Sequence, residues 1–305
     1  NLGISCLTKI NFLYLSILII KKVIKMADII LKFNKTESYL SKEQVKEVCP
    51  LAFADAPTNP EVSGKYLFVN TETIIDDLDK LGWQPVQAAQ RKSRGKDTIF
   101  SKHMVAFQNP DIMIKGVDGD DAYPRIIMTN SHDGMQAFKF SVGIYRLVCS
   151  NGLVVADEEF SDFKIKHKGY TFEELRGVVN QAVADLPNKV QVLNDMKNRT
   201  LTKEEQSQLA IDAMLIRAGI TPGSDKANEF EYDAETIEDI LSPKRTADEG
   251  DDLWRVFNVI QEKITQGDFH AALTGAKVRK VRKIKSFEKD LKVNKELFKL
   301  ATALV

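Results

Sequence analysis

Cysteine and histidine are scarce in this chain. Its 305 residues include three cysteines (Cys6, Cys49 and Cys149) and four histidines, and neither a CxxC nor an HxxxH spacing occurs. This scarcity excludes a disulfide-stapled domain and leaves no zinc motif. We therefore expect a fold that depends on its hydrophobic core, without a metal or a cofactor, in a reducing cytoplasm.

Phosphate-binding loops and long apolar runs are also missing. Neither GxxxxGK nor GxGxxG occurs, so no motif indicates a nucleotide-binding enzyme. The apolar run at residues 10–20 is shorter than the roughly 20 residues that span a bilayer, so we predict no membrane association. Residues 1–25 consist mostly of types encoded by AT-rich codons, and Met26 opens a segment of ordinary composition. We interpret these 25 residues as a translated upstream leader; a genuine interfacial helix or anchor is the alternative.

Two kinds of hydrophobic periodicity divide the chain. Residues 71–81 carry apolar side chains at helical spacing, and Gly82 follows as a stop signal. Between residues 83 and 166, short apolar runs alternate with turn formers, including Asp133-Gly134, which is a strong hairpin signal. This pattern predicts about six antiparallel strands in a meander. Residues 26–70 are expected to form an N-terminal arm.

The last part of the chain, residues 171–305, has helical patterns. Thr171 and Thr202 begin capping-box sequences, and residues 252–265 carry an apolar stripe at helical spacing. We therefore predict an α+β fold. A central antiparallel β-meander sheet, at residues 71–170, is preceded by a helix and followed by a helical C-terminal half.

Forty-three basic and forty-three acidic residues give a net charge of zero that conceals segments of opposite sign. Residues 225–252 contain eleven acidic and three basic residues, and residues 277–299 contain ten basic and three acidic ones. The basic C-terminal stretch can bind phosphate, neutralise the acidic segment of the same molecule, or face water. A second basic stretch lies in the loop of the first hairpin, at residues 91–102.

Basic side chains that follow a nucleic-acid backbone, with aromatic rings that stack on bases, form single-strand binding surfaces. Trp83 and Phe107 lie near the hairpin loop, but for both a place in the core is the better interpretation. The candidate nucleic-acid-binding residues are Arg91, Lys92, Arg94, Lys96, Phe100, Lys102, Lys277, Arg279, Lys280, Arg282, Lys283 and Lys285.

The sequence gives weaker evidence for catalytic residues than for nucleic-acid-binding residues. Ser131, His132 and Asp133 are consecutive, and neighbouring side chains on an extended strand point to opposite faces, so they cannot converge as nucleophile, base and orienting group. A turn is the better interpretation. Cys149 is expected to be a buried, inert thiol, and the carboxylates at residues 118–121 lack the rest of a calcium-binding loop. We assign no catalytic residue and no metal ligand.

Two separated motifs carry a resemblance to a known family. Residues 130–153 contain NSHDG, AFKF and YRLVCSNGL, and residues 253–297 begin with LWRVFN and include the basic stretch. In this order they resemble an uncharacterised family often labelled "phage/plasmid-like protein", over residues 71–304. The resemblance implies a gene of a phage or plasmid and the cytoplasm of a bacterial host cell. It implies no activity.

We interpret the chain as a nucleic-acid-binding accessory protein that binds and anneals single-stranded DNA in replication or recombination. DNA is the expected partner, and self-association into a homo-oligomer is a further expectation. A helix, a β-meander and a long helix occur in an order similar to that of phage single-strand annealing proteins, which is an analogy of fold only. The alternative is a non-catalytic protein-interaction factor that acts on a host protein or is carried in the virion, with the acidic segment as its docking surface.

Overall fold

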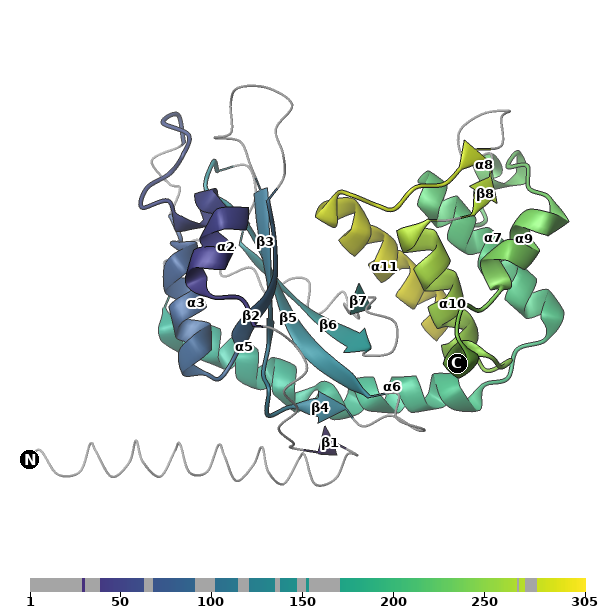
Figure 1. Ribbon diagram of the computed structural model, residues 1–305, viewed down its shortest axis with the longest axis horizontal. Helices are drawn as coiled ribbons and strands as arrows, with labels where there is room; N and C mark the ends of the chain where they lie inside the picture. The colour runs from purple at the N-terminus through teal and green to yellow at the C-terminus, as the bar shows by residue number, and fades with distance from the viewer. Residues whose placement is uncertain are drawn as a thin grey trace, which may run out of the picture.

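The computed structural model describes residues 29–30, 39–62, 68–90, 102–114, 121–134, 138–146, 152–153, 171–267, 269–271 and 279–305. In these ranges an antiparallel sheet occupies the middle of the chain, helices precede it, and the C-terminal half is helical, so the predicted α+β class is confirmed (Figure 1). The expected leader, residues 1–25, and the expected strand at residues 160–166 lie outside them.

Strand β5 (Ala122–Ser131) is the centre of the sheet. It pairs with β3 (Lys102–Gln108) on one side and with β6 (Lys139–Arg146) on the other. On the two flanks β2 (Gln84–Gln90) pairs with β3, and β7 (Gly152–Leu153) pairs with β6. All of these pairings are antiparallel, which is the expected meander.

Two short strands extend the sheet beside the start of β5. Strand β4 (Met113–Ile114) pairs with β5 through Ile114 and Ala122, and β1 (Ile29–Ile30) pairs with β4. In the N-terminal arm, α2 (Lys42–Val48) begins with a capping box at Ser41, and the 3-10 helix η1 (Pro50–Phe53) follows it.

Helices cover one face of the sheet. Figure 1 shows α2, α3 (Thr71–Lys80) and α5 (Phe172–Ala184) on this side. The side chains of β3 and β5 alternate between the two faces, so every second residue points into this layer. The core between the helices and the strands includes Val45, Ile74, Leu78, Val105, Phe107, Met128 and Leu175.

Helix α6 (Leu186–Asn198) connects this layer to the helical half. The helical structure is interrupted at Asp185, between α5 and α6 and shortly before Pro187. Proline cannot donate the backbone hydrogen bond of a helix interior. The remaining elements are α7 (Lys203–Ala218), α8 (Asp225–Asn228), α9 (Ala234–Leu241), η3 (Thr246–Asp248), α10 (Leu253–Gln266), β8 (His270–Ala271), β9 (Arg279–Lys280) and α11 (Phe287–Thr302).

The helical half and the sheet share one apolar core. Trp254, Phe257 and Ile260 of α10 belong to the same cluster of buried residues as the core of the sheet. The described helices include none with the length and apolar character needed to cross a membrane.

The other face of the sheet is turned toward α11. Met104, Ala106 and Ile127 pack against Phe287 and Leu291 at the start of that helix. Figure 1 shows α11 between the sheet and the rest of the helical half. This helix therefore brings the beginning of β3 close to the chain that precedes α11.

Candidate nucleic-acid interface

The basic segment, which we define as residues 279–285, runs in extended form from β9 to the beginning of α11 (Figure 1). Val281 and Ile284 point inward and are 8% and 6% exposed. The basic residues of the segment are all exposed, namely Arg279, Lys280, Arg282, Lys283 and Lys285. The alternation of buried anchors and exposed charges turns the positive charge toward solvent.

Contacts with the helical half hold the backbone of the basic segment in place. The amide of Val281 donates to the carbonyl of Phe269 at 2.7 Å, and that of Ile284 donates to Thr265 at 2.9 Å. Gly267, just after α10, has φ +78°, and a Cβ atom on it would lie 2.5 Å from the carbonyl oxygen of Val281. Glycine permits this close approach, so the segment is supported by packed backbone.

The side chains of the basic segment have few acidic neighbours. The side chains of Arg279, Arg282 and Lys285 form no hydrogen bond or ion pair with the part of the chain that the structure describes, whereas Lys280 takes part in a further contact. Lys283 is attracted by Asp290 without forming an ion pair. The side chains of Arg279, Arg282, Lys283 and Lys285 are therefore not paired with any described residue and can meet an external anion.

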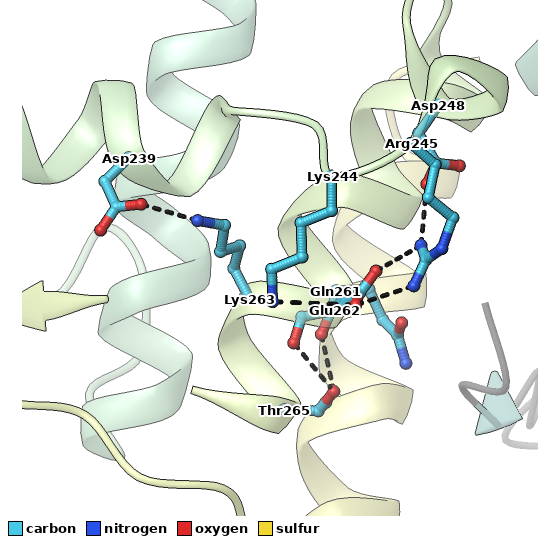
Figure 2. A network of polar contacts seen from close by, with 8 residues as sticks. All are labelled: Asp239, Lys244, Arg245, Asp248, Gln261, Glu262, Lys263 and Thr265. Atoms are coloured by element: carbon cyan, nitrogen blue, oxygen red, sulfur yellow. Dashed lines mark hydrogen bonds and ion pairs between the residues drawn. The ribbon is translucent and has the colours of Figure 1, made fainter. Parts of the chain in front are cut away.

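Several carboxylates of the acidic segment, residues 225–252, form contacts within the helical half. Figure 2 shows Asp239 2.6 Å from Lys263 of α10. In the same view Arg245 donates to Asp248 at 2.9 Å and to both carboxylate oxygens of Glu262, at 2.6 and 2.9 Å. These contacts attach α9 and the loop after it to α10, so they stabilise the fold of the helical half.

The end of the acidic segment is paired locally as well. Asp251 accepts a hydrogen bond from Lys203 of α7 at 2.7 Å, and Asp252 caps the N-terminus of α10 and pairs with Arg255. Among the described residues, no ion pair joins the acidic segment to the basic segment. The described contacts therefore give no support to the alternative of internal neutralisation.

Of the candidate binding residues in the first hairpin, only Lys102 lies among the described residues. Arg91, Lys92, Arg94, Lys96, Phe100 and Lys277 lie outside the described residues. Lys102, the first described residue after the loop, forms an ion pair with Glu288 at 2.9 Å and is not free to bind phosphate. This ion pair places the base of the hairpin beside the first turn of α11, next to the basic segment. The two basic stretches, far apart in sequence, thus have neighbouring attachment points.

Two of the aromatic residues near the hairpin belong to the core, as the sequence predicts. Trp83 and Phe107 are buried in the core, so neither can stack on a base. Of the three aromatic residues considered near the hairpin, Phe100 remains a candidate for stacking, and it lies outside the described residues.

The start of α11 contains charges with altered proton affinities. Burial raises the pKa of Asp290 to about 6, although Lys283 and Arg217 attract its carboxylate and act in the opposite direction. Burial and the neighbouring Arg217 lower the pKa of Lys289. Burial also lowers the pKa of Arg217. Burial is the largest cause of each of these three shifts in pKa.

The consecutive Ser131, His132 and Asp133 are all buried at the end of β5. Nε2 of His132 lies 3.1 Å from the Thr71 hydroxyl, and Nδ1 has no hydrogen-bond partner. The backbones of Leu51 and Val69 face this ring and oppose the lowering of its pKa by burial, but neither completes a well-directed hydrogen bond to Nδ1. The three residues therefore form no hydrogen-bonded catalytic relay.

A second histidine, His103 of β3, completes a buried polar cluster. Its Nε2 lies 2.9 Å from the Thr71 hydroxyl, which also accepts a hydrogen bond from Asn130 at 3.1 Å. Burial lowers the pKa of His103 to about 3, so the ring is neutral. The cluster attaches the start of α3 to β3 and β5. Sequence reasoning missed it, although the two-residue period places His103 on the same face as Val105.

Other candidate chemistry is limited within the described ranges. No three residues of the His, Cys, Asp and Glu types gather there as a possible metal site. Cys49 is a free, buried thiol whose pKa is raised to about 12 by burial, which makes it unreactive. Cys149 lies outside the described residues.

Comparison with known proteins identifies the family. Residues 60–298 match the family described as "Domain of unknown function (DUF932)", and since this is most of the chain, the chain belongs to that family. It is similar to two proteins of Escherichia coli (strain K12), UPF0380 protein YafZ and UPF0380 protein YfjQ. Each is 27% identical over 267 residues, which cover 87% of this chain and 92% of the relative. No solved structure matches. Membership of an uncharacterised family is therefore confirmed.

Proposed function

We propose that this member of the DUF932 family is a nucleic-acid-binding accessory protein of a phage or plasmid. Its ligand is single-stranded DNA, which it binds and anneals during replication or recombination in the cytoplasm of a bacterial host. The observation that supports this proposal is the basic segment. Five exposed basic side chains lie on a fixed backbone, and three carboxylates of the acidic segment, Asp239, Asp248 and Asp251, pair with other basic residues.

The dimensions of the basic segment suit a nucleic-acid backbone. An extended segment of this length spans about 20 Å, at roughly 3.3 Å per residue. Phosphates follow one another at about 3.4 Å along one strand of duplex DNA, so the segment can contact several of them. Each contact releases condensed counterions, which makes affinity depend on salt. The adjacent hairpin, with Phe100, would add a stacking contact and favour a single strand.

The test replaces Arg279, Arg282 and Lys285 together with glutamine. Fluorescence anisotropy with a labelled 20-nucleotide oligo(dT) strand, and with a duplex of equal length, is measured across a range of NaCl concentrations. We expect the parent to bind the single strand more tightly. We expect the variant to have a log–log salt slope smaller by about 2, because three contacts at about 0.7 each are lost.

A matched control removes the same charge from exposed sites on α2, α3 and α8, through Lys46→Gln, Lys80→Gln and Lys226→Gln. We expect its salt slope to stay within about half a unit of the parent's slope, since no phosphate contact is lost. The proposal is wrong if the parent binds neither DNA at low salt, or if the two triple variants weaken binding equally. Light scattering with and without oligo(dT) tests self-association.

A further inference from the structure

Beneath the basic segment, Arg217 of α7 is buried without a carboxylate partner. It is 8% exposed, its Nη2 donates to the carbonyl oxygen of Arg282 at 2.6 Å, and its Nε is buried with no hydrogen-bond partner. A buried guanidinium with an unsatisfied donor is unfavourable unless an anion compensates it. This position therefore favours the approach of a negative group.

Two lysines and one carboxylate surround the same position. Lys283 belongs to the basic segment, and Lys289 and Asp290 lie on the first turn of α11. Both lysines are exposed, and neither forms an ion pair with a described residue. Asp290 is attracted by Lys283 and by Arg217, and Lys289 is repelled by Arg217, so both lysines lie near Arg217 or its neighbour Asp290.

We propose that Arg217, Lys283 and Lys289 bind one phosphate of the nucleic-acid backbone, and that Asp290 controls the affinity of this site through its own charge. The ionised carboxylate repels the phosphate, and the neutral carboxyl group does not. The proposal rests on the proposed function and adds to it a defined phosphate position and a dependence on pH.

The direction of the pH effect follows from the surroundings of Asp290. Because burial raises its pKa to about 6, the carboxylate becomes neutral as the pH falls through that value, and repulsion of a phosphate disappears. Two further described residues nearby are Glu288, which is paired with Lys102 of β3, and His270 of β8, which lies opposite Lys280 of β9 in the strand register. His270 is therefore replaced in the test that follows.

The decisive variant is Asp290→Asn, made in a His270→Gln background so that this histidine cannot contribute. Binding of labelled oligo(dT) is measured at pH 7.5 and pH 5.5 at equal ionic strength. We expect Asp290→Asn to bind about five- to tenfold more tightly than its background at pH 7.5. The background protein should gain a similar factor on acidification, and the Asn variant should gain less than about twofold. A gain in affinity cannot result from misfolding.

Glu296→Gln provides the matched control. Glu296 lies farther along α11, where it pairs with Lys292, and its replacement changes the net charge by the same amount. We expect its affinity and pH dependence to equal those of the background protein. Equal affinity of Asp290→Asn and its background at both pH values overturns the proposal, as does an equal gain in Glu296→Gln.

Two further measurements separate this inference from the proposed function. If the background protein binds oligo(dT) but Asp290→Asn and Lys283→Gln both leave the affinity unchanged, only the phosphate position is wrong. If no variant binds oligo(dT), both proposals are wrong. Stabilisation of Asp290→Asn by inorganic phosphate in thermal unfolding, without affinity for oligo(dT), would indicate a site for a small anion and overturn the assignment to nucleic acid.

Discussion

The buried histidines beneath α3 make folding sensitive to acid. His103 and His132 are 0% and 1% exposed and share the hydroxyl of Thr71, and burial lowers the pKa of both rings, to about 3 for His103. In the unfolded chain each ring returns to a pKa of about 6.5. The unfolded state then binds a proton that the folded state does not bind. The stability that depends on the two neutral histidines is therefore fully present above about pH 6.5 and is lost as the pH falls toward 3.

The magnitude follows from this difference in proton binding. One pKa unit corresponds to about 1.4 kcal/mol, so between pH 7 and pH 5 His103 alone should lower the free energy of unfolding by about 2 kcal/mol. Asp290 acts in the opposite direction. Its pKa, raised from 3.8 to about 6, makes the folded state take up a proton first as the pH falls. The parent protein and a His103→Gln variant share this contribution of Asp290, so it cancels when their free energies of unfolding are compared.

Urea unfolding at pH 7, 6 and 5, followed by circular dichroism, measures the effect. We expect the parent to lose about 2 kcal/mol more than His103→Gln over this range, because glutamine keeps a polar side chain but does not titrate. His270→Gln, which removes an exposed histidine, should keep the difference between pH 7 and pH 5 seen in the parent. Parallel pH dependence of the parent and His103→Gln would refute the argument.

Two further predictions concern the support of the basic segment. Gly267→Ala should lower the free energy of unfolding by about 2–4 kcal/mol in urea titrations, through positive φ and a clash with the backbone of the segment. Gly219→Ala, with φ +83° and open space around its Cβ position, should cost only about 1 kcal/mol, and equal losses would contradict this contact. Glu262→Gln should cost about 1–3 kcal/mol in the same assay, because it breaks the two-oxygen contact with partly buried Arg245; a loss below about 0.5 kcal/mol would contradict it.

Local signals were enough to predict most of the elements. The capping box at Thr202 and the glycine at position 219 mark both ends of α7, because these interactions involve residues only a few positions apart. Short apolar runs between turn formers likewise predicted β3, β5 and β6, because strands that are covered on both faces carry apolar side chains along most of their length. The charge of residues 277–299 and their spacing of apolar anchors were also visible in the sequence.

The partners of those charges were decided by the tertiary structure. Composition left open whether the acidic segment neutralises the basic one, and packing of α9 against α10 places one of its carboxylates, Asp239, beside Lys263. The proximity of Lys102 to Glu288, and of Arg217 to Asp290, depends on where α11 lies between the sheet and α7. An isolated sequence shows which residues are charged and how they alternate along the chain. Which charges meet, and which remain free for a ligand, depends on contacts between distant residues that form only when the core closes.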